Sequence, residues 1–442
     1  MIRLLIIADD LTGALDSGVK LAEAGIPTEV RISPGCPDSP DEEFEASTLT
    51  LVVDTQTRHL PAGEAYARVE SLVHWARKKG IRLFYKKTDS TLRGNLGVEM
   101  AALMNAGGGG PLVFAPAFPA LGRTTEGGRQ YVNGVPLEDT VFARDLLNPV
   151  RTGSVREILR QGVDLDVREV EPSGLAAALR EAGEQEKELL VIVVNGRTEE
   201  DLAETARALA RALARSRNGG RSLRTKGDGG GASRPLLAGC AGFAAHLPEL
   251  LGFHRAEPEK PRLRGPLVAV NGSLHPVSLG QTRAAIRSGF LDVALEPEEI
   301  LSPEAREEAV RKIVSASMEG RPCALRSVLH DADFQDYRRK AEEFGLPPGE
   351  IHKILPRFMG DIVRDAASRA VMGTLVVFGG DTLGGILEAF GKRAIVPLAE
   401  TFSGVVAARV PGVPNPRHLV SKAGGFGDDE FLIELLRLIR DP

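Results

Sequence analysis

The hydrophobic positions of this chain fall in short continuous runs, and each run ends abruptly in a polar turn. Apolar runs without alternation are typical of parallel strands that are buried on both faces of a sheet. Segments with helical periodicity separate most of these runs, which favours an α/β fold. In the first half we expect strands at residues 3–8, 49–53, 81–85, 111–115, 189–194 and 236–239.

The second half repeats this pattern. We expect helices that start near residue 280, span about 359–372 and end at Gly391. The stretch between the halves, residues 254–265, is charged and interrupted by prolines. The pattern predicts two α/β domains, residues 1–253 and 266–442, with mainly parallel sheets and an active-site cleft between them. The strands expected in the second domain are 267–270, 292–296, 323–327, 374–378, 395–398 and 418–420.

Composition narrows the class of protein. A chain of 442 residues is too long for one ordinary core, and 43% apolar with 26% charged residues is typical of a soluble globular protein. A net charge of -5 argues against nucleic acid as the main partner. No apolar run reaches the roughly 18 residues of a membrane helix. The short apolar start ends at Asp9 and Asp10, so we expect no signal peptide and a cytoplasmic protein.

Two further features of the sequence carry less information. The three cysteines fit neither a metal-site spacing nor a disulfide set, so no structural metal is expected. Residues 216–234 form a glycine-rich, basic tract. We interpret this tract as a flexible surface loop and not as a nucleic-acid arm, because no aromatic residues lie between its charges.

Polar clusters follow four strands of the first half, near Asp9, Arg58, Lys87 and Arg123. In an open α/β sheet, ligands bind beyond the carboxyl ends of the strands. Cations and carboxylates at that edge suit a small, anionic, hydroxylated substrate. The alternative is that these groups cap helices or lie in solvent. Capping explains one aspartate of the Asp9–Asp10 pair, but not both.

Glycine-rich turns follow two strands of the second half, at Gly379–Thr382 and at Lys422–Gly427. Glycines let the backbone approach a phosphate, and the N–H groups that open the next helix point toward it. Neither turn has the glycine spacing of a P-loop or a dinucleotide fingerprint, and simple turn chemistry is the alternative. Together with Gly272–Ser273, and with Lys422 to offset phosphate charge, the turns favour a nucleotide site.

Over nearly its whole length the chain resembles the four-carbon acid sugar kinases, which phosphorylate tetronates such as threonate and erythronate with ATP. The most specific part of the resemblance is the run Lys87–Asn95. The sequence departs from the family pattern at Ala423, where the family usually has serine, and this puts a hydroxyl contact in doubt but not the backbone turn. The other matching positions are Ile7–Gly13, Arg58, Ala115–Pro119, Gly122–Thr124, Gly272–Ser273, Gln281, Gly379–Thr382, Lys422 and Gly424–Gly427.

The resemblance implies an N-terminal domain that binds the sugar acid and a C-terminal domain that binds ATP. Mg²⁺ would bridge the ATP phosphates with its water shell, so no protein metal site is expected. The residues expected at the substrate are Asp9, Asp10, Arg58, Lys87, Thr88, Asp89, Ser90 and Arg93. The residues expected at the nucleotide are Ser273, Gly379, Gly380, Asp381, Thr382, Lys422, Gly424 and Gly425.

Phosphoryl transfer depends mainly on positioning and charge stabilisation, with a carboxylate to accept the alcohol proton. We predict that Asp89 is this base, that Asp9 holds substrate hydroxyls, and that Arg58 and Lys87 bind the substrate carboxylate. One alternative places the base at Asp381, as in ribokinase-type sugar kinases. A non-catalytic sugar-acid sensor and a nucleotide-linked oxidoreductase are two others. The sequence leaves open which four-carbon acid is used, which hydroxyl is phosphorylated and whether the chain forms a homodimer.

Overall fold

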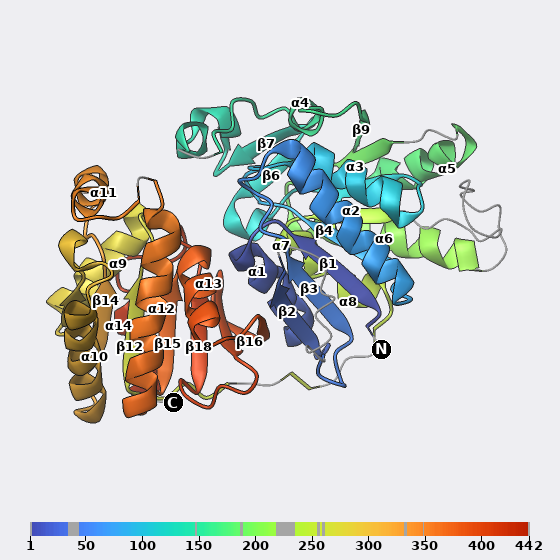
Figure 1. Ribbon diagram of the computed structural model, residues 1–442. Helices are drawn as coiled ribbons and strands as arrows, with labels where there is room; N and C mark the ends of the chain where they lie inside the picture. The colour runs from blue at the N-terminus through green and yellow to red at the C-terminus, as the bar shows by residue number, and fades with distance from the viewer. Residues whose placement is uncertain are drawn as a thin grey trace. The chain divides into compact units, whose positions relative to one another are not determined.

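The computed structural model describes residues 2–33, 44–145, 148–185, 189–217, 235–253, 257–258, 261–330, 334–347 and 349–440. The chain divides into two compact units, Met1–Glu257 and Pro258–Pro442, which we call unit 1 and unit 2 (Figure 1). Most of the glycine-rich tract, residues 218–234, lies outside the described residues.

Unit 1 is built on an open parallel sheet with the strand order β2-β3-β1-β4-β11-β5-β10-β9. The strands are β1 (Leu4–Ala8), β2 (Thr28–Ile32), β3 (Thr50–Asp54), β4 (Leu83–Lys87), β5 (Leu112–Ala115), β9 (Asp166–Val170), β10 (Leu190–Val194) and β11 (Leu236–Gly239). The helices are α1 (Leu11–Glu23), α2 (Ala62–Lys78), α3 (Leu96–Gly107), α4 (Val155–Leu159), α5 (Leu175–Gln185), α6 (Glu199–Arg217), α7 (Ala241–Ala244) and α8 (Leu247–Leu250).

Strand β1 shows why the apolar runs of this unit do not alternate with polar residues. All five of its residues are buried. Leu5 and Ile7 pack in a core with residues of α2 and α3, and α1 packs against β1 and β3 as well. Helices cover both faces of a doubly wound sheet, so a central strand needs apolar side chains at every position.

The carboxyl ends of β1, β3 and β4 lie side by side. Ala8 of β1 is paired with Asp54 of β3, and Ile7 is paired with Lys86 of β4. The polar turns that follow these strands therefore meet at one edge of the sheet, as the sequence predicts. A small antiparallel sheet of β6 (Arg123–Glu126), β7 (Arg129–Val132) and β8 (Val135–Pro136) follows β5 in the chain.

Unit 2 is also an α/β unit, with the strand order β13-β14-β12-β15-β18-β17-β16. Its first five strands are parallel, and β17 is antiparallel to both of its neighbours. The strands are β12 (Leu267–Asn271), β13 (Leu291–Ala294), β14 (Cys323–Arg326), β15 (Thr374–Phe378), β16 (Ala394–Phe402), β17 (Val405–Arg409) and β18 (His418–Lys422). The helices are α9 (Pro276–Arg287), α10 (Pro303–Met318), α11 (Phe334–Glu343), α12 (Ile351–Arg369), α13 (Gly380–Ala389) and α14 (Phe431–Arg440).

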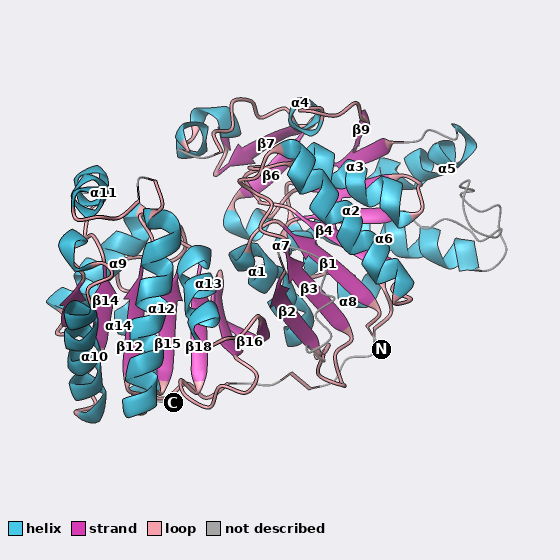
Figure 2. Ribbon diagram, in the orientation of Figure 1, coloured by secondary structure: helices cyan, strands magenta, loops and turns pink. Residues whose placement is uncertain are grey.

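Different helices cover the two faces of the unit 2 sheet. Val376 and Phe378 pack in a core with Phe431 and Leu435 of α14, and Phe378 and Phe431 make an edge-to-face ring contact. Helices α12 and α13 pack closely on each other and lie in front of β12, β15 and β18 in Figure 2. The glycine turn between β15 and α13 is thus held between a buried strand and a packed helix pair.

Two predicted elements of unit 2 need correction. The helix expected at 359–372 begins at Ile351 and includes Pro356. The proline removes one hydrogen bond of this helix. Helix α13 packs closely at the same place, since a β-carbon at Gly385 would lie 2.3 Å from the Pro356 carbonyl oxygen, and this packing offsets the loss. The strand expected at 395–398 is the start of the nine-residue strand β16, which pairs with the unanticipated strand β17.

Candidate active site

Asp9 and Asp10, at the end of β1, are held by one arginine from the turn after β3. Arg58 donates from Nε to Asp9 Oδ2 at 2.8 Å, from NH2 to Asp9 Oδ1 at 3.1 Å and from NH1 to Asp10 Oδ2 at 2.8 Å. Asp10 also caps α1, since its Oδ1 accepts from the Gly13 amide at 3.0 Å. Capping thus explains Asp10, whereas Asp9 is 3% exposed and is bound to Arg58.

Asp89 is held by an arginine from its own turn. Arg93 donates from Nε to Asp89 Oδ2 at 2.7 Å and from NH2 to Oδ1 at 3.2 Å, and its NH1 donates to Asp145 at 3.0 Å. Asp89 Oδ1 also lies 3.9 Å from Arg58 NH2, which links the β1 and β4 turns. Gly94 has a φ of 95°, and a β-carbon there would lie 3.4 Å from Asp9 Oδ2, so glycine lets this turn pass close to the cluster.

The charges of this cluster fix the protonation of its carboxylates. Burial alone would raise the pKa of Asp9, but Arg58 and Lys86 outweigh burial and hold that pKa below its usual value. Burial is likewise outweighed at Asp89, whose pKa Arg93 and Arg58 hold well below its usual value. Burial raises the pKa of Asp54 well above normal, and the Asp10 and Asp9 charges raise it further. The site therefore combines two ionised carboxylates with a neighbouring carboxyl group that holds its proton more tightly.

The remaining predicted substrate residues lie on the same turn. Lys87 is buried and donates to the Thr88 carbonyl at 2.7 Å, and a β-carbon on Gly13 would lie 2.7 Å from its Nζ. The hydroxyl of Thr88 is buried and has no hydrogen-bond partner in the described part of the chain. The carbonyl of Ser90 accepts from Gln130 Nε2 at 3.1 Å, which ties the turn to strand β7.

A buried ion pair behind this turn was missed by sequence reasoning. Lys86 Nζ lies 2.9 Å from Glu99 of α3, and it also donates to the Ile7 carbonyl at 3.2 Å. Both side chains are almost fully buried. Lys86 and Lys87 are adjacent in a strand, so they point to opposite faces of the sheet, but the sequence does not tell which of them faces Glu99. Asp54 and Asp145 also belong to the site and were not anticipated, whereas Arg123 was singled out by the sequence pattern but not assigned to the substrate.

In unit 2 the predicted glycine turn opens α13. Gly379 is the N-cap residue with a φ of 89°, and no described side chain caps this helix. The first N–H groups of α13 therefore remain available to an anion, and the helix dipole favours negative charge at this end. Asp381 is exposed in the first turn and Thr382 is buried. A β-carbon on Gly272 would lie 2.4 Å from Thr382 Oγ1, which brings the β12 turn against the same helix end.

The turn after β18 closes on the turn after β12. A β-carbon on Gly424 would lie 2.9 Å from His275 Cβ and 3.1 Å from Ser273 Oγ. Ser278 donates to the Gly424 carbonyl at 2.9 Å. Gln281 donates to the carbonyls of Phe426 and Asp428 at 3.0 and 2.7 Å, while its own Oε1 is buried with no partner among the described residues. The structure thus brings Ser273, the α13 N-terminus and Gly424 together.

Lys422 lies beneath this turn. Its Nζ donates to the carbonyls of Ala423 and Gly424 at 3.0 and 3.2 Å and lies 5.2 Å from the centroid of the Phe378 ring. The side chain is fully buried, and burial lowers its pKa from 10.5 to about 7. No carboxylate pairs with it in the described chain. A phosphate bound above the turn would supply the missing negative charge.

These residues fit a bound nucleotide better than a protein-held metal ion. An uncapped helix start beside closely packed glycines is suited to phosphate oxygens. The described residues contain no cluster of three or more histidine, cysteine or carboxylate side chains that could hold a metal.

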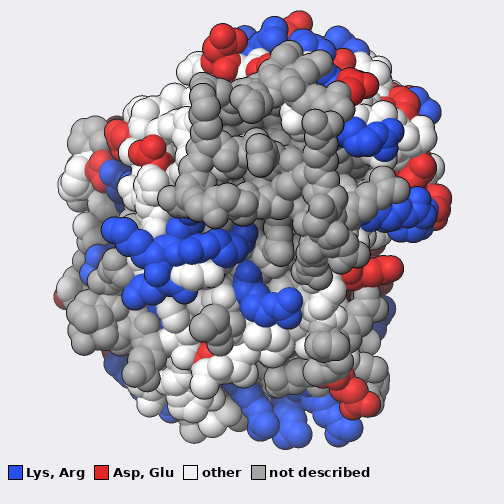
Figure 3. All heavy atoms as spheres, turned by 90° about the vertical axis from the view of Figure 1, so that its right-hand side faces the viewer, with Lys and Arg blue, Asp and Glu red and all other residues white. Residues whose placement is uncertain are grey.

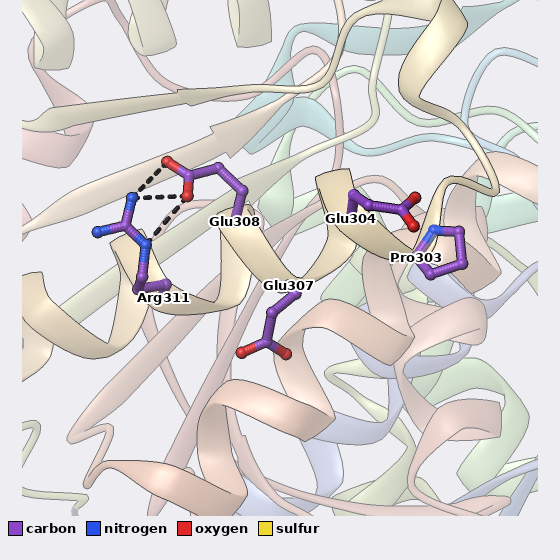
Figure 4. A pocket seen from close by; sticks show the side chains of 5 residues that line it. All are labelled: Pro303, Glu304, Glu307, Glu308 and Arg311. Atoms are coloured by element: carbon purple, nitrogen blue, oxygen red, sulfur yellow. Dashed lines mark hydrogen bonds and ion pairs between the residues drawn. The ribbon is translucent and has the colours of Figure 1, made fainter.

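The described surface outside these two sites has a different character. A hollow of about 390 Å³ along α10 is lined by Pro303, Glu304, Glu307, Glu308 and Arg311 (Figure 4). Glu308 pairs with Arg311 and Glu307 pairs with Arg369, so two of its three carboxylates are matched by arginines at the surface. On the face shown in Figure 3, Lys and Arg side chains gather left of the centre and at the bottom, and Asp and Glu side chains lie mainly toward the upper and right edges. In the described part of the chain, no helix combines the length and the apolar character needed to span a membrane.

Comparison with known proteins agrees with this geometry. Residues 4–247 match a family described as a sugar-binding N-terminal domain, and residues 268–432 match a nucleotide-binding C-terminal domain. The chain is 31% identical to a D-threonate kinase of Salmonella typhimurium, over 99% of each chain. It is 32% identical to a D-threonate kinase of Cupriavidus necator, over 97% of this chain and 96% of the relative. A 3-oxo-tetronate kinase of the same organism is 29% identical, over 98% and 96%.

Solved structures share the fold. A Salmonella typhimurium protein superposes with a TM-score of 0.77 at 22% identity, over 99% of each chain. A Haemophilus influenzae protein superposes with a TM-score of 0.71 at 19% identity, over 98% of this chain and 100% of the other.

Proposed function

This chain belongs to the four-carbon acid sugar kinase family, and we propose from that premise that it phosphorylates D-threonate at the unit 1 cluster with ATP bound by unit 2. The relatives establish the class, an ATP-dependent kinase of four-carbon sugar acids. D-threonate is the substrate of choice because two relatives that are more than 30% identical over at least 96% of both chains are D-threonate kinases. A D-erythronate kinase of Heliobacterium modesticaldum is 35% identical, but over only 46% of this chain.

The buried cluster at the ends of β1, β3 and β4 is the observation that carries the proposal. Its carboxylates accept from hydroxyl groups, and Lys87 at the same edge has no carboxylate partner among the described residues, so the cluster suits a small hydroxylated acid. Asp9 is fixed in orientation by two bonds from Arg58, and it is ionised at neutral pH. Within this proposal Asp9 receives hydroxyls of the sugar acid.

The nucleotide site supports the proposal independently of the charged cluster. Backbone N–H groups of Gly380, Asp381 and Thr382 would bind phosphate oxygens, with Ser273, Gly424 and Gly425 on the facing turns. Lys422 would offset phosphate charge from below. Bound ATP with Mg²⁺ supplies the phosphoryl group and neutralises its charge. Ala423 is compatible with this arrangement because the contacts come from the backbone.

We assign proton transfer from the attacking hydroxyl to Asp89. Arg93 and Arg58 keep this carboxylate ionised by lowering its pKa. Asp89 is therefore a weak base, but it is deprotonated and ready to accept a proton at neutral pH. A weak base suits phosphoryl transfer, in which positioning and charge stabilisation contribute more than proton abstraction. Asp381 is the alternative base, since it is exposed in the first turn of α13, next to the proposed phosphate position.

A coupled assay of ADP release across a panel of four-carbon acids tests the proposal. We expect the highest kcat/KM with D-threonate and none with ATP alone. Faster turnover of D-erythronate or of a 3-oxo-tetronate would replace D-threonate as the substrate. Absence of ADP release with every acid, while Mg-ATP and an acid each raise the melting temperature, would favour a sensor instead of a kinase.

A further inference from the structure

We propose that Arg123 is the cation that recognises the carboxylate of the sugar acid, and that it distinguishes the acid from a neutral sugar. The inference rests on the proposed function, because it names the side chain that binds the substrate carboxylate at the unit 1 site. Arg123 opens strand β6, outside the turns that follow β1, β3 and β4.

The other arginines of the cluster are already matched by carboxylates. Each of the three nitrogens of Arg58 donates to Asp9 or Asp10. Arg93 is shared in the same way between Asp89 and Asp145. Each guanidinium therefore faces two negative charges, and a further carboxylate placed there would meet net repulsion.

Lys87 and Arg123 are the cations of this edge that lack a carboxylate partner within the described chain. Arg123 NH1 donates to the Leu121 carbonyl, whereas its Nε is buried and without any hydrogen-bond partner in that same part of the structure. Leaving a buried charged donor unpaired costs free energy, and native proteins rarely do so without a ligand or water. A carboxylate oxygen is the acceptor that a guanidinium binds most strongly.

Arg123 feels the charges of the cluster and is tied to it through strand β7. Burial lowers the pKa of Arg123, the Asp89 charge raises it and the Arg93 charge lowers it, so all three groups lie within electrostatic range. Gln130, on the strand paired with β6, accepts from Thr125 at 2.7 Å and donates to the Ser90 carbonyl at 3.1 Å. This side chain ties the hairpin that carries Arg123 to the substrate turn.

A second connection runs through the end of β11. The Arg123 backbone exchanges two hydrogen bonds with Phe118, and Cys240 Sγ donates to the adjacent Ala117 carbonyl at 3.1 Å. On the other side, the Thr88 amide donates to the Gly239 carbonyl at 2.9 Å. The unpartnered Thr88 hydroxyl and the unpartnered Arg123 Nε thus belong to segments joined at one strand end. A hydroxyl and a guanidinium together are the donor set that a hydroxy acid needs.

The test compares D-threonate with its neutral amide. The KM is measured for D-threonate, and the amide is measured as a competitive inhibitor of D-threonate phosphorylation and, where it turns over, as a substrate. Losing a charge-assisted hydrogen bond should raise the KM of Arg123→Gln for D-threonate by roughly 10- to 100-fold. Affinity for the amide should change less than about 3-fold, because the neutral amide makes no charge-assisted bond that the substitution could remove. The KM for ATP should stay at its wild-type value, and Arg123→Lys should recover part of the affinity for the acid.

Arg129→Gln is the matched control, because Arg129 lies in the same hairpin with a 45% exposed side chain paired to Glu138. The inference fails if Arg123→Gln binds the acid as tightly as wild type, or if acid and amide are weakened equally. It also fails if Lys87→Gln loses the preference for the acid over the amide while Arg123→Gln keeps that preference. If Arg123→Gln does not fold, the acid-to-amide ratio of Arg123→Lys decides. A wild-type protein that phosphorylates no four-carbon acid would refute the proposed function instead.

Discussion

The two candidate sites lie at equivalent places in two α/β units, yet they are built from different parts of the chain. Unit 1 uses charged side chains from separate strand ends, and Arg58 pairs with aspartates 48 and 49 residues away in sequence. Unit 2 uses backbone groups of glycine turns, with Lys422 buried beneath one of them. A hydroxy acid must be distinguished by its substituents, whereas a phosphate can be held by any correctly placed row of N–H groups.

This difference predicts two kinds of sensitivity. The unit 1 site should fail when a charge is removed, because its groups depend on each other's charges. The unit 2 site should fail when a side chain is added, because its geometry depends on missing β-carbons. Because the unit 2 contacts come from the backbone, alanine at position 423 in place of the family's usual serine should leave phosphate binding intact.

The largest effect is expected from removing a charge at Asp89. Asp89→Asn should lower kcat by about 100-fold or more while both KM values stay within a few-fold, as expected for loss of a positioned proton acceptor. Because the pKa of Asp89 is well below its usual value, wild-type kcat should stay flat as the pH falls from 8 to about 5. Asp381→Asn is the comparison. If turnover is lost there and kept in Asp89→Asn, the base belongs to unit 2.

Arg58→Ala should affect both stability and acid binding. It would leave Asp9 buried without its partner, and breaking a buried ion pair costs about 3–5 kcal/mol of unfolding free energy. We also expect a strongly raised KM for the acid and a nearly unchanged KM for ATP. Urea unfolding and steady-state kinetics measure these effects. Arg197→Ala, which removes a 55% exposed side chain, is the control and should change little. Normal saturation by the acid in folded Arg58→Ala would contradict the proposal that Arg58 positions Asp9 for the substrate hydroxyls.

Adding a side chain tests the other half of the comparison. Gly380→Val would place a branched side chain at the first residue of α13, and ATP affinity should fall about 10-fold or more as phosphate contacts are lost. Gly384→Val is the matched control, since a β-carbon there meets no atom within 4 Å. Calorimetric titration with Mg-ATP measures both. Equal affinities of the two variants would argue against a phosphate site at this helix start.

The smallest effect concerns the buried cation of unit 2. Burial lowers the pKa of Lys422 from 10.5 to about 7, so between these values the unfolded chain binds more protons than the folded chain. The lysine therefore makes the free energy of unfolding rise as the pH increases through this window. Lys422→Met should remove that rise, which melting curves at pH 7 and pH 9 would show. Parallel pH dependence of the two proteins would exclude a titrating Lys422.

A bound phosphate gives a second readout of the same group. The negative charge should raise the pKa of Lys422, so ATP binding near pH 8 should take up a fraction of a proton in wild type. Lys422→Met should show none of this uptake. Calorimetry in buffers of different ionisation enthalpy measures the uptake directly, and equal values for both proteins would contradict the placement of phosphate above Lys422.

Local patterns were enough to predict several parts of both sites. The neighbouring positions of Asp9 and Asp89 at two strand ends are confirmed by the pairing of β1 with β4. The turn at Gly379 is likewise a helix start. Both follow from where an apolar run stops, which is a property of a few adjacent residues. The functional roles of these residues stay predictions.

Sequence by itself therefore determined most of the buried parallel strands, where they end and which polar groups stand at those ends, but it did not predict β2, β9 or β17. The tertiary structure decided how the groups pair: Asp89 binds Arg93 and not Lys87, Lys86 pairs with Glu99, and Lys422 is buried with no carboxylate partner among the described residues. Helix α12 also continues through Pro356, although proline disfavours the interior of a helix. The physical reason is that periodicity is read from neighbours in the chain, whereas charge pairing and burial depend on distances between residues that only the fold brings together.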